Sequence, residues 1–334
     1  MSADFRLVVT KAPMRITFTG GGSDFPRFYR AYGPGAVVSA AINRYIYVSI
    51  AKNFYDKEYR ISYSKTENAI PDRNMIEHPT VREALKLLDV KCGIQIISIT
   101  EIPSRGTGLG SSSSFLVALL LALHTWIGES VTAETLAQEA YKIEREILNE
   151  PGGKQDQYLA AYGGINLMKF NIDDSVEMKP IIMTKEMRRK LEEHLLMFYT
   201  GIERSSASIH TEQLKNVDNH VEYYQRMSSI ALDTYDAISS MNIERIAELM
   251  EQNWNLKKKL NNGISDANIE KMYQTAKNAG ALAGKLMGAG GGGFMLFLVN
   301  PDQRENVINA LKEYRMEEFK IDTFGSRIAY FEDY

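Results

Sequence analysis

Residues 103–114 form a glycine- and serine-rich run with the composition of a phosphate-binding loop. Three of its glycines stand within five positions: Gly106, Gly108 and Gly110. The residues before it, 94–100, are rich in β-branched side chains and predict a strand, and residues 115–123 after it favour a helix. Glycines let backbone N–H groups approach an anion, and a helix N-terminus adds unpaired N–H donors. The run therefore predicts an anion site between a strand and a buried helix.

Two common phosphate-binding motifs do not fit this run. A Walker A loop needs a lysine after its last glycine, and none follows Gly110; the spacing Gly-x-Gly-x-x-Gly of dinucleotide-binding loops is absent. The four serines that follow Gly110 can cap the helix or bind a Mg²⁺ ion carried by a phosphate. A simple helix cap is the alternative interpretation, but it needs fewer glycines and serines than are present.

Two further glycine-rich turns lie near the ends of the chain. Residues 11–24 predict a strand that runs into three consecutive glycines, and the carboxylate of Asp24 follows on the turn. A carboxylate only accepts hydrogen bonds, which suits sugar hydroxyls, although an ordinary turn capped by an aspartate is the alternative. Residues 285–294 hold five glycines in six positions between apolar segments, which is not the composition of a helix, a strand or a flexible linker.

Together the three runs resemble, in order, the three motifs of the GHMP kinases, the superfamily of galactokinase, homoserine kinase, mevalonate kinase and phosphomevalonate kinase. The second motif of that superfamily, a proline followed by Gly-Leu-Gly-Ser-Ser, is matched by Pro103, Gly108, Leu109, Gly110, Ser111 and Ser112. The third, Lys-x2-Gly-x-Gly-x-Gly-Gly, is matched from Lys285 to Gly293. The resemblance covers residues 11–299 and implies a kinase that uses ATP and Mg²⁺.

The resemblance also implies an α+β, two-domain GHMP kinase fold with ATP in the cleft between the domains. Residues 1–180 would form the N-terminal ATP-binding domain, a mixed α/β domain of the ribosomal-protein-S5-like type, and residues 181–334 a C-terminal domain of helices and a sheet. The apolar periodicity agrees with such a mixture. Strands are predicted at 37–51, 59–64, 195–199, 295–299 and 321–331, with turns at Asn43-Arg44 and 53–56. Helices are predicted at 80–88, 132–148, 185–194, 205–239, 242–260 and 266–279.

Phosphoryl transfer needs positioning, charge neutralisation and an oriented nucleophile. A glutamate in the predicted helix 132–148 is a candidate ligand for the cation that neutralises charge. The apolar face of this helix consists of Leu136, Ala140, Ile143 and Ile147. Glu144 adjoins that face and Glu146 does not, so Glu144 is expected to point inward. By resemblance to an inward helix glutamate of the family, Glu144 and Ser112 would hold Mg²⁺. An exposed, salt-bridged glutamate is the alternative.

Asp156 lies in Gly152–Tyr158, a segment that resembles the Gly-x-x-Asp-Gln segment of galactokinase-like proteins. The resemblance implies that Asp156 accepts or orients the proton of the acceptor hydroxyl, with Arg15 as the second catalytic residue. A helix N-cap is the alternative role of Asp156. The nucleotide-binding residues implied by the second motif are Pro103, Gly106, Gly108, Leu109, Gly110, Ser111, Ser112 and Ser113. The substrate-binding residues implied are Gly21, Gly22, Ser23, Asp24, Gly153, Arg204, Lys285, Gly290, Gly291 and Gly292.

Residues 199–209 narrow the resemblance to one group of sugar kinases. Arg204 and three serines lie at a predicted helix start, which favours anion binding. With residues 15–24 and 78–82, this corner is similar to heptose 7-phosphate kinases and fucokinase domains, which phosphorylate an anomeric hydroxyl. The resemblance implies conversion of D-glycero-D-manno-heptose 7-phosphate to the 1,7-bisphosphate, for the synthesis of nucleotide-activated heptose and surface polysaccharide.

A substrate that already carries a phosphate needs a second anion site, and Arg204 is the first candidate for it. Arg15, Arg27 and Lys285 are the next, and a surface arginine beside a helix cap is the alternative for Arg204. An L-fucose-type 1-kinase is the second function considered, followed by a mevalonate-pathway kinase and a decarboxylase variant. A catalytically inactive ligand sensor is the alternative of another class, but a sensor need not keep the carboxylates of Glu144 and Asp156.

The composition limits the partners and the location. The chain has 334 residues, 44% of them apolar, which suffices for a large core and two domains. A net charge of −3 without a long basic block speaks against nucleic-acid or membrane-surface binding. One cysteine, Cys92, excludes an intrachain disulfide, and no signal-like or membrane-spanning run is visible. We therefore expect a cytoplasmic protein that binds a small phosphosugar, with a homodimer left open.

Overall fold

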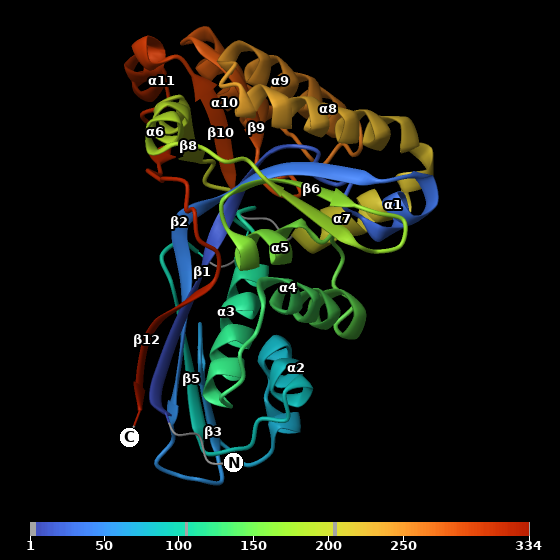
Figure 1. The fold of residues 1–334 in the computed structure, drawn as a ribbon. Coiled ribbons are helices and arrows are strands. Elements are labelled where there is room, and N and C mark those ends of the chain that lie inside the picture. The colour runs from blue at the N-terminus through green and yellow to red at the C-terminus, as the bar shows by residue number, and fades with distance from the viewer. Residues whose placement is uncertain (1–4, 104–105, 203–205, 334) are drawn as a thin grey trace.

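The computed structural model describes residues 5–103, 106–202 and 206–333, which form two β-sheets with helices packed on them (Figure 1). Eight strands belong to the first sheet and four to the second. The division of the chain at residue 180 stays a prediction. The chain does pass from one sheet to the other near that point, between β7, which ends at Pro180, and β8, which begins at Leu195.

Two long strands, β1 and β2, form the centre of the first sheet. Its strand order is β12-β1-β2-β5-β3-β4, and β6 pairs with β2 and β7. Because β12 pairs with β1, the last residues of the chain return to the N-terminal sheet (Figure 1). The strand bounds are β1 Phe5–Thr19, β2 Gly35–Lys52, β3 Tyr59–Ser62, β4 Thr66–Ile70, β5 Ile94–Thr100, β6 Ile165–Phe170, β7 Val176–Pro180 and β12 Arg327–Asp333.

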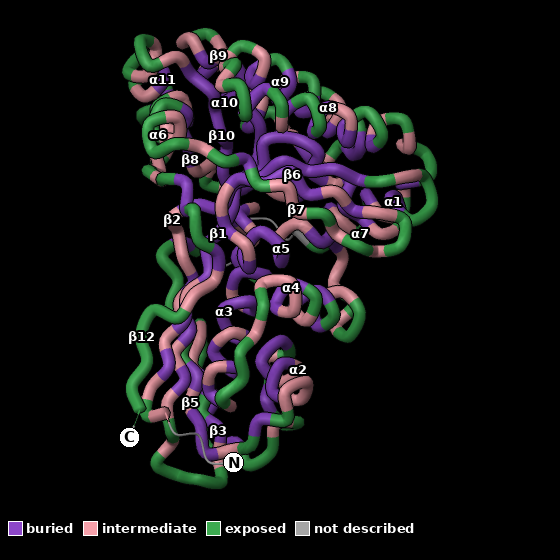
Figure 2. The backbone as a smooth tube through the Cα atoms, in the orientation of Figure 1, coloured by how far each residue is buried: buried purple, intermediate pink, exposed green. Residues whose placement is uncertain are grey.

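Helix α3, Ser111–Trp126, is the central helix of the first half and packs on β1 and β2. Most of its residues are buried (Figure 2), because it is apolar on nearly all sides rather than on one face. This burial fixes the position of the serines at its N-terminus. The other helices are α1 Pro26–Tyr32, α2 Pro79–Leu87, α4 Ala133–Tyr141 and α5 Gln155–Tyr162, with a 3₁₀ turn at Arg73–Met75.

The second sheet has the strand order β11-β8-β10-β9 and carries the C-terminal helices. Helix α9 packs on β9, and α8 packs both on α9 and on β2 of the first sheet. The strand bounds are β8 Leu195–Tyr199, β9 Ala281–Leu286, β10 Phe294–Val299 and β11 Arg315–Met316. The helices are α6 Lys185–Glu193, α7 Ser206–Lys215, α8 Val221–Ser239, α9 Ile243–Lys258, α10 Ala267–Asn278 and α11 Arg304–Ala310, with 3₁₀ turns at Val217–Asn219 and Pro301–Gln303.

Two predicted elements have different bounds in the structure. The predicted helix 205–239 is two helices, α7 and α8, separated by the turn around Val217–Asn219. The asparagines and the aspartate in this stretch favour turns over helix interiors. The predicted strand 321–331 begins only at Arg327. A Cβ atom on Gly325 would lie 1.9 Å from the carbonyl oxygen of Ala161, so this segment wraps around the end of α5 instead of pairing as a strand.

The predicted turn at Asn43-Arg44 is wrong, because β2 continues through it. Pro13 of β1 pairs with Tyr45, and the next residue, Met14, pairs with Ile42. The two extra residues of β2 form a bulge that the sheet accommodates without ending the strand. The sequence Asn-Arg therefore marks a local irregularity of a long strand and not its end.

The predicted helix 132–148 changes its geometry midway. Helix α4 ends at Tyr141, and a π-helix, Lys142–Ile147, follows it. In this segment the N–H of Leu148 donates to the carbonyl oxygen of Ile143, five residues back, at 2.9 Å. A π-turn contains more residues than an α-turn, so it changes which side chains face the core.

The π-helix buries the glutamate and exposes a neighbouring apolar residue. Glu144 is fully buried and Glu146 is exposed, so the predicted direction of the two side chains is confirmed. Ile147, expected on the buried face, is 40% exposed, which corrects that part of the prediction. A regular α-helix would have kept Ile147 in phase with Ile143.

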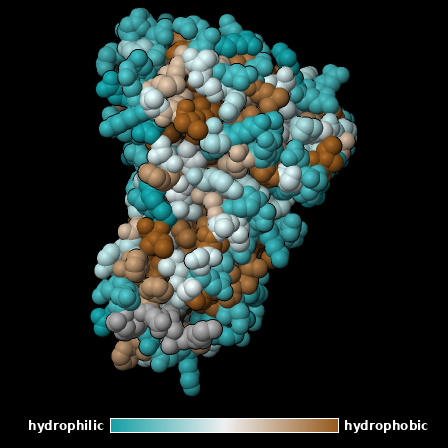
Figure 3. Space-filling view, in the orientation of Figure 1, coloured by the Kyte–Doolittle hydropathy of each residue, from teal (hydrophilic) through white to brown (hydrophobic). Residues whose placement is uncertain are grey.

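Hydrophilic side chains cover most of the face shown in Figure 3, and hydrophobic ones appear there in small separate groups. This agrees with a chain in which 24% of the residues are charged. Within the described ranges, none of the helices combines the length and the apolar character that crossing a membrane requires.

Candidate active site

The second and third glycine-rich runs meet backbone to backbone. A Cβ atom placed on Gly108 would lie 2.5 Å from the carbonyl oxygen of Met287, and one placed on Gly293 would lie 2.4 Å from that of Thr107. The N–H of Phe294 donates a hydrogen bond to the carbonyl oxygen of Thr107 (3.2 Å). Any other residue would put a side-chain atom into the neighbouring backbone. The loop after β5 and the loop between β9 and β10 therefore form one structural unit.

Helix α3 begins at Ser111, directly after the last glycine of the second run, so it includes the four serines as well as the predicted helical residues 115–123. Gly106, Gly108 and Gly110 have φ angles of 72°, 73° and 76°, in the left-handed region that favours glycine. Leu109 between them is buried, and its carbonyl oxygen accepts a hydrogen bond from the N–H of Arg15 (2.9 Å), which ties the loop to β1. Pro103 is exposed at the start of the run. The loop thus leads into the first turn of α3, where backbone N–H groups commonly bind phosphates.

Three side chains converge on the buried carboxylate of Glu144. Ser112 Oγ donates to its Oε1 at 2.8 Å, and Ser113 Oγ donates to its Oε2 at 2.7 Å. Gln157 Nε2 of α5 also donates to Oε2, at 2.5 Å. The cluster joins the N-terminus of α3, the π-helix and α5, three segments that the sequence alone does not place together.

The donor chemistry of this cluster fits Mg²⁺. Mg²⁺ prefers hard oxygen ligands and is usually held by one or two carboxylates together with substrate phosphates and water. The carboxylate of Glu144 and the hydroxyl of Ser112 supply such oxygens beside the phosphate loop, and Ser112 is exposed to solvent. The described residues contain no group of three or more histidine, cysteine or acidic side chains that could hold a metal without phosphates.

Arg15 of β1 and Asp156 of α5 form a bidentate ion pair beside the glycine loop. Arg15 Nε donates to Asp156 Oδ1 at 2.8 Å, and Nη2 donates to Oδ2 at 3.0 Å; Nη1 donates to the carbonyl oxygen of Gly108. Burial alone would raise the pKa of the Asp156 carboxyl, but Arg15 outweighs burial and holds that pKa below its usual value. Asp156 is therefore ionised at neutral pH. A Cβ atom on Gly110 would lie 3.3 Å from the carboxyl carbon of Asp156, so the Arg15–Asp156 ion pair adjoins the glycine loop.

Asp24 is a second, buried carboxylate on the turn after β1. Its Oδ1 accepts a hydrogen bond from the N–H of Gly22 (2.9 Å), and its Oδ2 accepts one from the N–H of Gln155 (3.1 Å). Burial raises the pKa of Asp24, and the N–H of Gln155 opposes this rise. A Cβ atom on Gly153 would lie 1.9 Å from Asp24 Oδ2, so only glycine fits there. The two segments predicted to bind substrate are therefore in direct contact.

Besides Arg15, four side chains with basic groups lie around these carboxylates: Arg145, His210, Lys257 and Lys285. Of these four, the sequence had suggested only Lys285 of β9. Lys257 of α9 and Lys285 are both buried. Arg145 Nε donates to the carbonyl oxygen of Gly153 (3.3 Å). Burial lowers the pKa of His210 to about 4, with further lowering by the nearby cations, so this histidine is neutral at physiological pH. The site is consequently more basic than its sequence motifs indicate.

These groups line one small pocket of about 30 Å³. Its lining residues are Arg15, Thr17, Gly21, Gly22, Asp24, Phe25, Arg145, Gly153, Gln155, Asp156, His210, Gln213, Lys257, Lys285 and Gly288. The volume is about that of one water molecule, because the polar side chains of the lining fill most of the site. The pocket nevertheless brings together most of the predicted catalytic and substrate-binding residues.

Four other predicted substrate-binding residues lie outside this lining: Ser23, Gly290, Gly291 and Gly292. Ser23 is buried and its hydroxyl donates to the carbonyl oxygen of Gly20 (2.8 Å), so it holds the turn rather than a ligand. Gly290 and Gly292 pack against Ile264 and Ile202, respectively. The N–H of Gly291 donates to the carbonyl oxygen of Ile264. Gly288 is the glycine of the third run that faces the pocket.

The predicted phosphate-binding Arg204 lies outside the described residues. Another candidate, Arg27, forms an ion pair with Asp218 on the exposed surface. It does not belong to the pocket lining.

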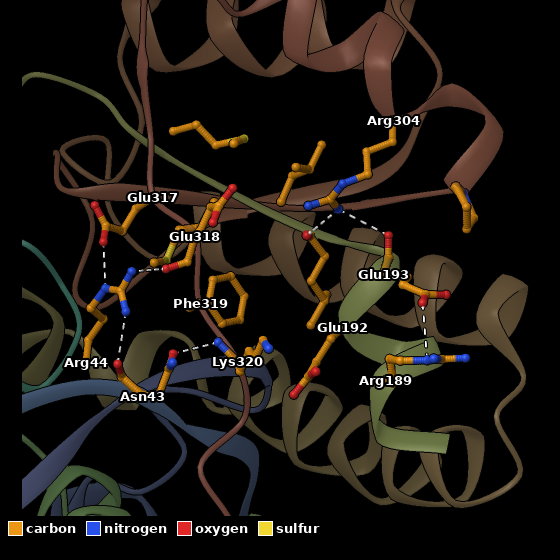
Figure 4. Close-up of a pocket in the computed structure, with 15 residues that line it drawn as sticks. Asn43, Arg44, Arg189, Glu192, Glu193, Arg304, Glu317, Glu318, Phe319 and Lys320 are labelled. Atoms are coloured by element: carbon orange, nitrogen blue, oxygen red, sulfur yellow. Dashed lines mark hydrogen bonds and ion pairs between the residues drawn. The ribbon is translucent and has the colours of Figure 1, made fainter. Parts of the chain in front are cut away.

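A larger cavity of about 610 Å³ lies between α6, β8 and residues 315–320 (Figure 4). Two of its arginines pair with glutamates of the same lining: Arg44 with Glu317 (2.6 Å) and Arg189 with Glu193 (3.5 Å). None of the three glycine-rich runs contributes to its described lining. We therefore place the candidate active site in the smaller pocket, where the glycine loops, the carboxylates and the basic side chains meet.

Comparisons with known proteins agree with this geometry. The model of the GHMP kinases N terminal domain matches residues 76–164, and the model of the GHMP kinases C terminal domain matches residues 234–315. A D-glycero-alpha-D-manno-heptose 7-phosphate kinase of Campylobacter jejuni is 28% identical over 92% of this chain and 94% of its own length. An L-fucokinase/L-fucose-1-P guanylyltransferase of Bacteroides fragilis is 26% identical over 89% of this chain and 35% of its own length.

A solved structure extends the likeness to the whole fold. The structure of a D-glycero-D-manno-heptose 1-phosphate kinase from Bacteroides thetaiotaomicron superposes with a TM-score of 0.81 at 26% identity, covering 97% of this chain and 99% of that one. The predicted α+β fold is thereby confirmed. The two domain matches, in the same order as the glycine-rich motifs, show that the chain belongs to the GHMP kinases, a family of ATP-dependent phosphotransferases.

Proposed function

We propose that this kinase transfers the γ-phosphoryl group of ATP to the anomeric hydroxyl of a sugar phosphate, with D-glycero-D-manno-heptose 7-phosphate as the leading substrate. The observation that carries the proposal is the Arg15–Asp156 pair, which lies between the glycine loop at Gly110 and the turn that bears Asp24. The similar proteins of Campylobacter jejuni and Bacteroides thetaiotaomicron are heptose phosphate kinases by name, which supports the choice of sugar.

In this proposal the two carboxylates have different tasks. Asp156, kept ionised by Arg15, accepts or orients the proton of the attacking hydroxyl. Arg15 also neutralises charge that develops on the transferred phosphoryl group. Asp24 and the backbone at Gly153 hold hydroxyl groups of the sugar, since a carboxylate fixed by backbone N–H groups is a directed acceptor. Phosphoryl transfer depends mainly on such positioning and charge neutralisation.

Ser112 and Glu144 would hold the Mg²⁺ ion that accompanies ATP. When bound, Mg²⁺ neutralises the phosphate oxygens and fixes their orientation. Ser113 and Gln157 keep the carboxylate of Glu144 in place through the hydrogen bonds described above. The backbone N–H groups at the start of α3 would contact the same phosphates.

The glycine loop can be tested separately from the chemistry. Gly110→Ala is expected to raise the Kd for ATP about tenfold, the loss of one hydrogen bond to a charged group. Its Cβ would lie 3.3 Å from the Asp156 carboxyl carbon and 3.4 Å from Arg15 Cγ, at a φ of 76°. Gly128→Ala is the matched control, because its φ is 78° and a Cβ there meets nothing within 4 Å. Titration calorimetry with ATP that finds equal affinities in both folded variants would show that the loop does not hold the nucleotide.

The function itself is tested by ADP release with a panel of acceptors. Wild-type protein should use heptose 7-phosphate with a higher kcat/KM than free heptose, L-fucose, galactose or mevalonate. The similarity to the fucokinase of Bacteroides fragilis makes L-fucose the second candidate, and a preference for free L-fucose would replace the heptose assignment. A catalytically inactive sensor would bind one of these compounds without releasing ADP; the placement of Glu144 and Asp156 speaks against this alternative.

A further inference from the structure

Two buried lysines beside the turn after β1 have carbonyl partners but no ion pair within the described part of the chain. Lys257, near the end of α9, is 6% exposed, and its Nζ donates to the carbonyl oxygen of Gly288 (2.6 Å). Lys285, in β9, is also buried, and its Nζ donates to the carbonyl oxygen of Thr17 (2.7 Å). A buried ammonium group is costly unless an anion compensates its charge. The pair therefore points to an anionic ligand.

The charge of the pocket lining supports the same conclusion. Its charged members are four cations and two carboxylates: Arg15, Arg145, Lys257, Lys285, Asp24 and Asp156. When all six groups are ionised, the lining carries an excess of two positive charges. A phosphate monoester carries about −1.5 to −2 charges at pH 7 and matches this excess.

Lys257 lies on the side of the pocket where the acceptor sugar is expected. Its Nζ is 3.9 Å from the position that a Cβ atom on Gly21 would take, in the turn that carries Asp24. Burial lowers the pKa of Lys257 to about 8 and Arg15 lowers it further, while the carboxylates of Asp24 and Asp156 offset only part of this shift. Burial, Lys257 and Arg15 hold the pKa of Lys285 well below its usual value. Each lowered pKa means that the surroundings destabilise the protonated form of the lysine, and a bound anion would stabilise that form.

We propose that Lys257, supported by the charge of Lys285, binds the phosphate group that the acceptor sugar already carries. The proposal rests on the function proposed above and assigns the preference for sugar monophosphates over free sugars to these two residues. The sequence had suggested Arg204 first for this role, with Lys285 among the next candidates, and it had not suggested Lys257. Helix α9 thereby contributes to substrate selection from the second half of the chain.

Removing the charge of Lys257 tests the proposal through the KM for the sugar monophosphate. Lys257→Gln is expected to raise the KM for the sugar monophosphate about ten- to a hundredfold, since hydrogen bonds to charged groups are strong. The KM for ATP should stay within about twofold of the wild-type value. Lys257→Arg should recover much of the affinity. Lys259→Gln is the matched control, because Lys259 lies exposed on the same helix end.

Proton uptake gives a second readout that a purely structural role would not produce. At a pH of about 8.5 the wild type should take up protons when it binds the sugar monophosphate, because the anion raises the pKa of Lys257. The groups that face Lys257 are Arg15 on β1, Asp24 on the following turn, Asp156 on α5, Lys285 on β9 and His210 on α7. Lys257→Arg should bind with reduced uptake, as titration calorimetry in buffers of different ionisation enthalpy would measure.

Inorganic phosphate provides a test on the wild-type protein alone. It should inhibit competitively against the sugar monophosphate and not against ATP. Competition with ATP only, or a Lys257→Gln variant impaired only in its KM for ATP, would assign Lys257 to the nucleotide phosphates and overturn the proposal. An unchanged KM for a sugar monophosphate that the wild type uses would refute the role of Lys257 and leave the proposed function intact. A wild type that prefers free sugars would refute both.

Discussion

Asp156→Asn is expected to lower kcat by about 10²–10⁴-fold, the usual contribution of a general base, while the affinity for ATP stays almost unchanged. The carboxylate is held by two hydrogen bonds from Arg15, and its lowered pKa keeps it ionised at the pH of the assay. An asparagine has nearly the same shape but cannot accept the proton. Steady-state kinetics and ATP titration calorimetry would measure the two effects separately.

Asp173→Asn is a suitable control for this variant, because Asp173 is an exposed aspartate whose described hydrogen bonds come from Ser175. It should leave kcat unchanged. Turnover of Asp156→Asn near the wild-type value would remove Asp156 from the mechanism. A loss of ATP binding of similar size to the loss of kcat would indicate damage to the adjoining glycine loop instead.

The role of Arg15 predicts a shift in the pH profile. Arg15 lowers the pKa of Asp156, and burial raises it. In Arg15→Gln burial acts unopposed by this cation, so the pKa of Asp156 rises and the acidic limb of the kcat profile should move to higher pH. The same limb should keep its position in Arg27→Gln, because Arg27 pairs with Asp218 on the surface. An unshifted limb in Arg15→Gln would mean that Asp156 orients the hydroxyl without accepting its proton.

Glu144→Gln is expected to raise the Mg²⁺ concentration needed for half-maximal rate at least tenfold and to lower kcat. Loss of a group that only hydrogen-bonds to a metal ligand costs about 10–100-fold in affinity, and loss of the ligand charge should cost no less. Glu146→Gln should change neither the Mg²⁺ requirement nor kcat, because Glu146 is exposed whereas Glu144 is buried. The measurement is a Mg²⁺ titration of the initial rate at fixed ATP.

Stability has to be followed in the same experiment, since Glu144 is fully buried and accepts three hydrogen bonds. A glutamine there keeps one acceptor oxygen, but its amide group faces donors, and a lower Tm is expected. Excess Mg²⁺ should restore part of the rate of Glu144→Gln. The Tm of this variant, measured without nucleotide or sugar, should not change when Mg²⁺ is added. Equal Mg²⁺ requirements in Glu144→Gln and Glu146→Gln would contradict the metal assignment.

Several parts of the fold and the site follow from local sequence patterns. The strand 94–100, the glycine loop and the start of α3 agree with the structure because β-branched residues, glycines and an apolar run act over a few neighbouring positions. The inward direction of Glu144 and the outward direction of Glu146 agree with the phase predicted for an α-helix, whereas the exposure of Ile147 does not. The three motifs were sufficient to predict the kinase family.

A pattern of this kind in α9 also indicates that Lys257 is buried. The buried face of α9 carries Ile246 and Met250 and continues, at helical spacing, with Asn253 and Lys257. Polar residues in phase with a buried apolar stripe are a signal that a helix faces a polar site. Within the run Lys257-Lys-Lys259, however, a charged surface is the simpler interpretation, and the sequence does not show which element covers that face.

The sequence alone was enough for the family and the glycine loops, and it predicted Asp24, Glu144 and Asp156 as site carboxylates, because each of these depends on residue types close together in the chain. The tertiary structure decided which distant segments share one pocket. It alone shows Lys257 of α9 beside the turn at Gly21, and Gly288 rather than Gly290–Gly292 facing the site. It also shows the π-turn, which arises where α3, α4 and α5 pack together around Glu144. Contacts between segments far apart in the chain depend on packing, and no local pattern encodes them.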